Sequence, residues 1–208
     1  MAEPDSARRT SNRRGMATRE AMLNAAVEAL ATGDPAAVSA NRIAKQIGVT
    51  WGTVQYQFGD ADGFWAAVLH HTAERRASLF ANTDSGAPLR SRVAGIIDTL
   101  YDGLDAPDSR AIENLRAALP RNPEDLDRLY PATAAELRSW GQSWNETCQK
   151  AFADLHVNPR RGHHVAAFIP GAMRGLVSEK QLGSYADLDE ARDGLTNAIA
   201  AYLSESSH

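Results

Sequence analysis

Apolar residues near the N-terminus recur with the period of an α-helix. Four of them follow an i, i+3, i+4, i+7 spacing, which places them on one helical face. They are Leu23, Ala26, Val27 and Leu30. Gly33-Asp34-Pro35 then ends the element, because proline cannot continue a helix. The pattern predicts a first helix whose apolar face packs on a core.

Two short helices separated by a tight turn are predicted next. Ser39 is a favoured N-cap for the first, and Gly48 ends it because glycine readily adopts the left-handed conformation. Thr50 caps the second helix, which runs through Phe58. The helical period turns one set of side chains inward and another outward. The inward set is Ile43, Ala44, Ile47, Trp51, Val54 and Phe58, and the outward set is Gly52, Thr53, Tyr56 and Gln57.

Helix-starting and helix-breaking residues divide the rest of the chain into further predicted helices. No segment of alternating apolar and polar residues predicts a strand. Asn122-Pro123 is a favourable helix start, while Pro131 and Pro170 are each expected to kink or split a helix. The fold class is therefore predicted to be all-α. The predicted helices cover residues 62–80, 89–104, 108–119, 122–155, 160–182 and 187–203.

These elements predict three parts: a basic disordered arm at residues 1–16, a helix-turn-helix domain at 17–60, and a larger C-terminal helical domain at 61–208. The net charge is −4, but residues 1–60 carry 7 Lys and Arg against 6 Asp and Glu, whereas residues 61–208 carry 15 against 20. The arm, including Arg13 and Arg14, is suited to neutralise phosphates or to reach into a minor groove. A solvated tail without a partner is the alternative.

Several functional classes lose support from the composition. Cys148 is the only cysteine, so no intramolecular disulfide forms and a cytoplasmic location is expected. No run approaches the roughly 20 apolar residues that span a bilayer. The pairs His70-His71 and His163-His164 are adjacent and not spaced to chelate, so no metal is expected. Without a phosphate-binding loop or nucleophile elbow, we expect neither a cofactor nor an enzyme.

A helix-turn-helix needs a supporting helix, a tight turn and a second helix with an exposed face. The segment from Ile43 to Phe58 supplies all three. Its pattern resembles the DNA-binding domain of the tetracycline-repressor (TetR) family over roughly residues 17–69, with order and spacing intact. The residues that carry the resemblance are Ile43-Ala44, Gly48-Val49-Thr50, Gly52-Thr53-Val54 and Phe58.

The resemblance implies a homodimer that recognises a near-palindromic operator in double-stranded DNA. Its two recognition helices would lie about 34–36 Å apart. A small molecule in the C-terminal domain would release the operator, so a ligand-responsive repressor is the leading interpretation. A helical enzyme or carrier, and a DNA binder without sequence preference, remain alternatives.

The resemblance also implies roles for individual residues. It places Asn41, Trp51, Thr53 and Gln55 near base edges, and Ser39, Thr50, Tyr56 and Gln57 near phosphates, with Gly52 allowing close backbone approach. Trp51 is equally placed to pack beside Val54.

The chain departs from the family pattern at Gln55 and Gln57, where Tyr and His are more usual, and at Ala61, where a phosphate-binding Lys is usual. Gln55 is suited to read adenine, or is simply solvated.

An apolar stripe in the region 122–155 has two interpretations. Ordinary core is one of them. Two tryptophans one turn apart also suit the lining of a cavity for a hydrophobic or aromatic effector. Cys148 on the same stripe is either inert packing or a redox sensor. The candidate ligand-binding residues are Tyr101, Leu104, Trp140, Trp144, Cys148, Phe168 and Met173.

Small residues spaced by four in the region 160–182 would let that helix approach a partner closely. An apolar stripe on the last helix complements them, and together they suit a two-fold interface of four helices. Burial within one subunit is the alternative. The candidate interface residues are Ala167, Gly171, Gly175, Leu188, Leu195, Ile199 and Tyr202.

Overall fold

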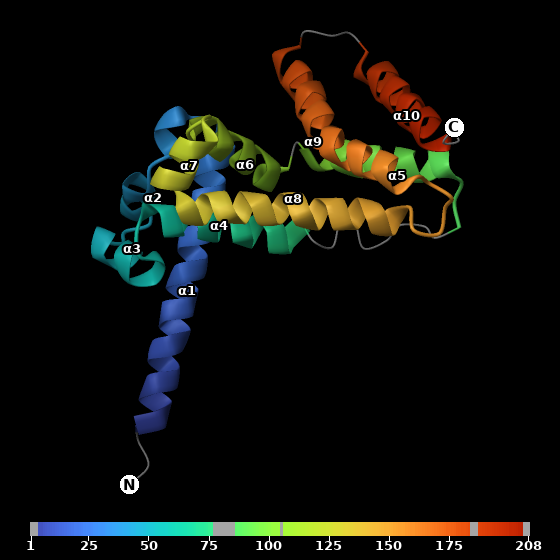
Figure 1. Cartoon of the computed structure of the whole chain (residues 1–208). Helices are drawn as coiled ribbons and strands as arrows, with labels where there is room; N and C mark the ends of the chain where they lie inside the picture. Colours follow the sequence, from blue (N-terminus) through green and yellow to red (C-terminus); the bar gives the residue numbers. More distant parts are fainter. Residues whose placement is uncertain (1–3, 77–85, 105, 184–186, 206–208) are drawn as a thin grey trace. The chain divides into compact units, whose positions relative to one another are not determined.

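The computed structural model describes residues 4–76, 86–104, 106–183 and 187–205, and within these ranges every regular element is a helix (Figure 1). The predicted all-α class is confirmed. A short 3-10 turn, η1 (Pro35–Ala37), follows the first helix. The helices are α1 (Pro4–Ala31), α2 (Ala40–Gln46), α3 (Trp51–Phe58), α4 (Ala61–Arg76), α5 (Leu89–Leu104), α6 (Pro107–Ala118), α7 (Pro123–Leu129), α8 (Pro131–Ala151), α9 (Pro159–Leu182) and α10 (Leu188–Ser204).

Prolines and caps set most of the helix boundaries. The predicted helix at 122–155 is split at Pro131 into α7 and α8. The side chain of Asn122 accepts a hydrogen bond from the Glu124 amide (3.0 Å), as expected of an N-cap. Pro170, in contrast, lies inside α9, which continues past it. The predicted extension of the fourth helix over residues 77–80 lies outside the described residues.

The first helix begins earlier than we expected, at Pro4. Residues 4–16 are therefore helical, and their assignment to a disordered arm was wrong. Proline is favoured at the first helical position, and no proline or glycine follows it before Gly15. Each residue added to an existing helix gains a hydrogen bond without a new nucleation cost, so the packed part of α1 extends toward the N-terminus.

Contacts divide the chain into two units. Unit 1 comprises Met1–Glu74 and Pro107–Leu137, and unit 2 comprises Arg75–Ala106 and Arg138–His208. Helix α8 begins in unit 1 and continues into unit 2. The structure thus groups α6 and α7 with the helix-turn-helix, whereas a functional boundary after residue 60 stays a prediction.

Unit 1 is held together by packing of α1 against α6 and of α2 against α1 and α3. The amide of Asn114 in α6 donates to the carbonyl of Leu30 (2.7 Å) at the end of α1. Helix α4 is joined to α8 by a carboxylate, because Asp62 accepts hydrogen bonds from the amides of Ala132 (2.8 Å) and Thr133 (2.9 Å). The largest buried side chains of this unit are Met22, Leu30, Ile43, Val54, Phe64, Leu69 and Leu115.

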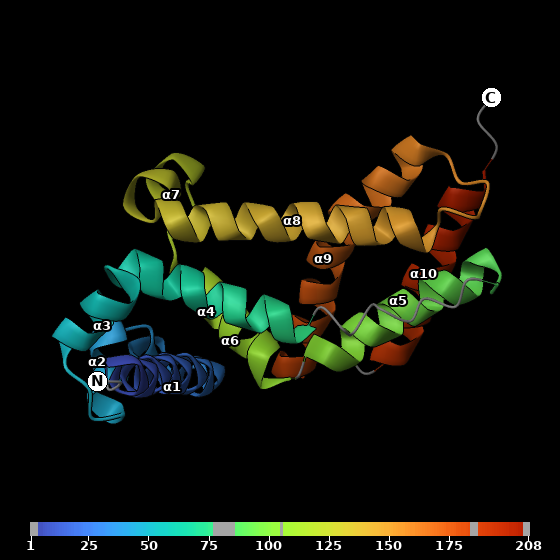
Figure 2. The same cartoon turned by 90° about the horizontal axis from the view of Figure 1, so that it is seen from below.

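Unit 2 is built on α5, α9 and α10, which pack on one another (Figure 2). Together with the second part of α8 they enclose an apolar core. Arg92 of α5 is buried at its edge. Its guanidinium pairs with the Asp154 carboxylate and donates to the carbonyls of Ala87 and Ala151 (both 3.0 Å). No described helix is long and apolar enough to cross a membrane. The core includes Val93, Ile97, Tyr101, Cys148, Val165, Ile169, Met173, Ile199 and Leu203.

Candidate nucleic-acid interface

The turn between α2 and α3 is set by local sequence. Ser39 caps α2, and its hydroxyl accepts from the Arg42 amide (3.3 Å). Gly48 has a φ of +72°, a conformation that favours glycine. Thr50 caps α3, and its hydroxyl accepts from the Thr53 amide (3.3 Å) and lies 3.1 Å from the Thr53 hydroxyl. The predicted caps and turn are confirmed.

Helix α3 presents a packed face and an exposed face. Val54 is fully buried, and the ring of Phe58 meets that of Phe64 edge-on, with centroids 5.0 Å apart. Tyr56 is 86% exposed. Gly52 and Gln55 of α3 are also exposed, as is Asn41 of α2, whereas Ser39, Trp51 and Thr53 are partly buried. Tyr56, Gly52 and Gln55 thus form the exposed face of α3.

Gln57 does not point freely outward with Tyr56. Its side-chain amide donates to the carbonyl of Gly15 in α1 (3.2 Å). Its own carbonyl accepts from the guanidinium of Arg19 (2.7 Å), which lies 4.3 Å from the centroid of the Phe58 ring. These contacts join residues about 40 positions apart, so helical periodicity gave no signal for them.

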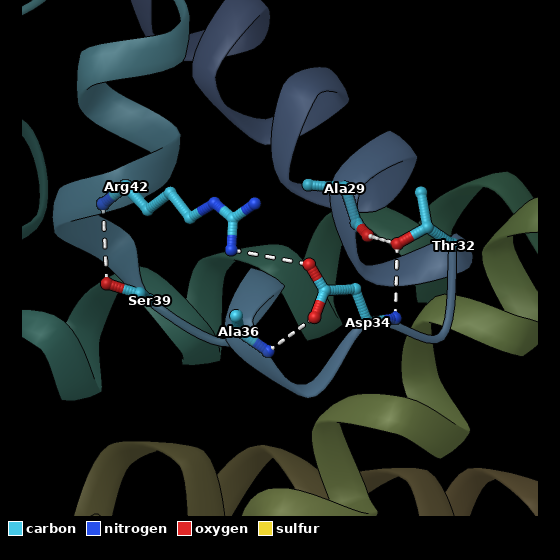
Figure 3. Close-up of polar contacts among 6 residues, drawn as sticks. All are labelled: Ala29, Thr32, Asp34, Ala36, Ser39 and Arg42. Atoms are coloured by element: carbon cyan, nitrogen blue, oxygen red, sulfur yellow. Dashed lines mark hydrogen bonds and ion pairs between the residues drawn. The ribbon is translucent and has the colours of Figure 1, made fainter.

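The segment between α1 and α2 is ordered by Asp34 (Figure 3). One carboxylate oxygen accepts from the Ala36 amide (2.9 Å), and the other lies 3.3 Å from the guanidinium of Arg42. The Thr32 hydroxyl accepts from the Asp34 amide (3.2 Å). Arg42, near the start of α2, was not among the predicted DNA-binding residues. Its charge is paired with that of Asp34.

The junction between α3 and α4 depends on a glycine that the sequence pattern did not single out. The Asp60 carboxylate accepts from the Gly63 amide (2.8 Å), and the Asp60 carbonyl accepts from the Phe64 amide (3.1 Å). A Cβ atom on Gly63 would collide with the backbone carbonyl of Phe58, the last residue of α3. This close approach fixes where α4 starts relative to the end of α3.

Exposed cations close in sequence to these elements include Arg13 and Arg14 on α1 and Lys45 on α2, besides Arg42, which Asp34 pairs. Neither Arg13 nor Arg14 has an ion-pair partner among the residues that the structure describes. Arg19 differs from them, because its charge is engaged with α3. The exposed cations are thus available to a polyanion.

The predicted ligand-binding residues divide into two groups. Tyr101, Cys148 and Met173 lie in the core of unit 2, and Trp144 packs against it while donating to the carbonyl of Ala166 (2.7 Å). Phe168 does not join them. It is 42% exposed on another face of α9, five residues or about 140° from Met173, so the structure does not bring it together with the others. The side chain of Leu104 lies outside the described part of the chain.

Two further observations concern this group. The indole N–H of Trp140 is buried and has no hydrogen-bond partner within the described residues. Burial raises the pKa of the Cys148 thiol to about 12. A thiol with so high a pKa stays protonated at neutral pH and is unreactive, so inert packing is the better interpretation of Cys148.

The predicted interface residues also divide. Ala167, Gly171 and Gly175 are exposed along α9. Ile199 is only 1% exposed inside the core of its own unit, so its assignment to an interface was wrong. The apolar stripe of α10 faces this core, and Leu188, Leu195 and Tyr202 pack against it. The small residues that α10 exposes instead are Ala191, Gly194, Ala198 and Ala201.

The histidine pairs bond to different partners and do not converge. His70 lies 3.1 Å from a Glu136 carboxylate oxygen, and His71 lies 3.0 Å from the Asn24 side chain. His163 contacts Asn145 (3.0 Å), and His164 contacts the Tyr202 hydroxyl (2.7 Å). Over the described residues, no group of three or more His, Cys, Asp or Glu side chains is placed to hold a metal ion.

Solved structures show what this architecture resembles. No protein-family model matches the sequence, and no curated protein is significantly similar to it. A transcriptional regulator from Rhodococcus sp. Rha1 superposes with a TM-score of 0.68 at 18% identity, over 91% of this chain and 99% of its own. A TetR transcriptional regulator from Chloroflexus aurantiacus J-10-FL gives 0.63 at 19% identity, over 93% and 98%.

The multidrug binding protein EbrR, solved in complex with imidazole, gives a TM-score of 0.63 at 18% identity, over 91% of this chain and 96% of its own. The chain therefore has the fold of TetR-type regulators along most of its length. This finding agrees with the motif resemblance noted in residues 17–69.

Proposed function

We propose that this chain is a DNA-binding transcription regulator, a repressor that a small hydrophobic effector releases from a palindromic operator. The observation that carries the proposal is the outer face of α3, where Tyr56 is 86% exposed beside Gln55 on a helix whose caps and core are fully formed. The second helix of a helix-turn-helix reads the major groove with its exposed side chains, and this face of α3 supplies such side chains. The fold of the neighbouring structures supports the same assignment.

The helical state of α1 refines the role of the basic segment. An α-helix with side chains is about 10–12 Å wide, whereas the minor groove of B-DNA is about 6 Å wide. A helical segment cannot enter that groove as an extended arm does. We therefore assign Arg13 and Arg14 to backbone phosphates, where they would add affinity without sequence preference.

Selection of bound sequences from random duplex DNA tests the proposed function. We expect a palindrome, with half-sites about one helical turn apart. Tyr56→Ala and Gln55→Ala should each weaken binding to that palindrome about tenfold or more. Glu20→Ala, an exposed change on α1, serves as the control. Equal affinity for random DNA, or unchanged affinity in both folded variants, would overturn the placement.

The effector is proposed to bind in unit 2 near Trp140. A buried N–H without a partner costs free energy, and a ligand with a hydrogen-bond acceptor would satisfy it. The EbrR neighbour is a multidrug binding protein, which supports a small-molecule effector for this fold. Trp140→Phe should weaken binding of a planar aromatic compound that carries a hydrogen-bond acceptor and quenches tryptophan fluorescence. Tyr130→Phe, a matched loss of one polar group, should not. Equal affinities would remove Trp140 from the site.

The small residues Ala167, Gly171 and Gly175 on the exposed face of α9 are proposed to meet a second copy of the chain. Their low side-chain volume permits close approach of helices across a two-fold axis. We place the protein in the cytoplasm, where such a regulator reaches its DNA.

A further inference from the structure

We propose that Gln57 is a positioning residue that holds the arginine-bearing start of α1 against the end of the recognition helix α3. This inference rests on the proposed function. It replaces the role that the family resemblance implied, in which Gln57 itself contacts a phosphate.

Three contacts converge on the last turn of α3. The Gln57 side-chain amide donates to the Gly15 carbonyl (3.2 Å), and the Gln57 carbonyl accepts from Arg19 (2.7 Å). The Arg19 guanidinium also covers the Phe58 ring at 4.3 Å. Gly15 and Arg19 are four residues apart and share a face of α1. Both backbone and side chain of Gln57 are therefore used to join the two helices.

The chemistry of the amide limits its use toward DNA. Of its polar sites, one N–H is bonded to Gly15, and its oxygen cannot bond to a phosphate oxygen because both are acceptors. Gln57 is also partly buried, whereas the neighbouring Tyr56 is exposed. Only the second N–H of the amide is left to donate to a phosphate while the bond to Gly15 is kept.

The bond between Gln57 and Gly15 lies directly beside two positively charged residues. Arg13 and Arg14 immediately precede Gly15 and are exposed. A helix rises 1.5 Å per residue, so both Cα atoms lie within about 3 Å of Gly15 along the helix axis. Fixing the Gly15 carbonyl therefore fixes where these two arginines emerge relative to α3. Over the described residues, the bond from Gln57 is the hydrogen bond that joins α1 before Arg19 to α3.

A double-mutant cycle on the full-length protein tests the proposal. Gln57→Met keeps the length and packing of the side chain but removes its donor. The reference change, Arg13→Ala with Arg14→Ala, should weaken operator binding about tenfold and reduce the salt slope by about 1.8, the value for two lost phosphate contacts. Gln57→Met alone should move both quantities in the same direction, and should have no further effect in the arginine-free background.

Additive effects would overturn the proposal, because Gln57 would then contact DNA independently of the arginines. An unchanged salt slope in Gln57→Met would overturn it as well. Amide hydrogen exchange of the free protein gives a second measurement, in which residues 13–19 should exchange faster in Gln57→Met at an unchanged melting temperature. If the wild-type protein selects an operator but the cycle is additive, only this inference fails; if it selects none, the proposed function fails.

Discussion

Gly63 is a residue whose missing side chain allows the end of α3 to approach α4 closely. The Phe58 carbonyl occupies the space where a Cβ atom would lie. Backbone cannot move aside as the end of a flexible side chain can, so a larger residue must displace α3 or α4. The identity of this residue thus acts on the orientation of α3 as well as on stability.

We predict that Gly63→Ala lowers the free energy of unfolding by about 1–3 kcal/mol, the usual cost of overpacking. Urea denaturation would measure it. Gly141→Ala in α8 is the matched control, because a Cβ atom added there would meet no other atom within 4 Å and alanine favours a helix by about 1 kcal/mol over glycine. A Gly63→Ala protein as stable as the wild type would show that the junction relaxes freely.

Asp154 gives a pH-dependent prediction. The hydrogen bond from Arg92 holds the pKa of its carboxyl group below the usual range. A pKa that is lower in the folded state stabilises the protein above the ordinary aspartate pKa, about 3.9, and this stabilisation is lost as the pH falls through the folded-state value. We expect wild type to exceed Asp154→Asn in stability by a constant margin from pH 7 to pH 5.

That margin should shrink below about pH 4, the ordinary range of an aspartate. Urea unfolding at a series of pH values would measure it, with Asp193→Asn, an exposed change on α10, as the control. A margin that stays constant down to pH 2 would mean that the Arg92 bond does not depend on the charge of Asp154.

At the scale of elements, the helices that were predicted well are those whose signals are local. The caps Ser39, Thr50 and Asn122 and the turn at Gly48 each follow from the chemistry of a few neighbouring residues. The beginning of α1 was missed, since helix propagation from a packed segment leaves no distinct sequence signal.

Contacts between elements were not predictable in the same way. The bonds from Gln57 to Gly15 and from Asp62 to Thr133 join distant parts of the chain, and periodicity gives the face of a helix but not its partner. The same limit explains Ile199, whose stripe was identified correctly but faces its own core. The candidate DNA-contacting residues themselves stay a prediction.

The first turn of α8 is capped by a carboxylate from α4. Because Asp62 accepts from the Ala132 and Thr133 amides, we predict that Asp62→Ala lowers the free energy of unfolding by about 1 kcal/mol, as does loss of an ordinary N-cap. Urea denaturation would measure this, with Glu28→Ala on the exposed side of α1 as the control. Equal losses in both variants would show that the cap contributes nothing specific.

At the scale of the whole molecule, association would be decided on the exposed face of α9. The nearest atom to a Cβ on Gly171 is the end of the Arg174 side chain at 4.0 Å, so its own subunit has room for a larger residue. We predict that Gly171→Leu makes a dimer monomeric at micromolar concentration in sedimentation velocity, and weakens operator binding.

The control for this experiment is Gly141→Leu, which introduces the same side chain at an exposed position of α8. It should remain dimeric. A Gly171→Leu variant that remains a dimer would place the interface elsewhere, and a wild-type protein that sediments as a monomer would overturn the proposed dimer.

The division of unit 1 into two stretches of chain has a consequence for its synthesis. Residues 75–106, which belong to unit 2, are translated before α6, the helix on which α1 packs. The surface of α1 that packs on α6 is therefore covered only after Pro107–Ala118 has been synthesised. A nascent chain halted after residue 74 would hold the complete helix-turn-helix with the part of α1 that packs on α6 open to water, and so would be prone to aggregate.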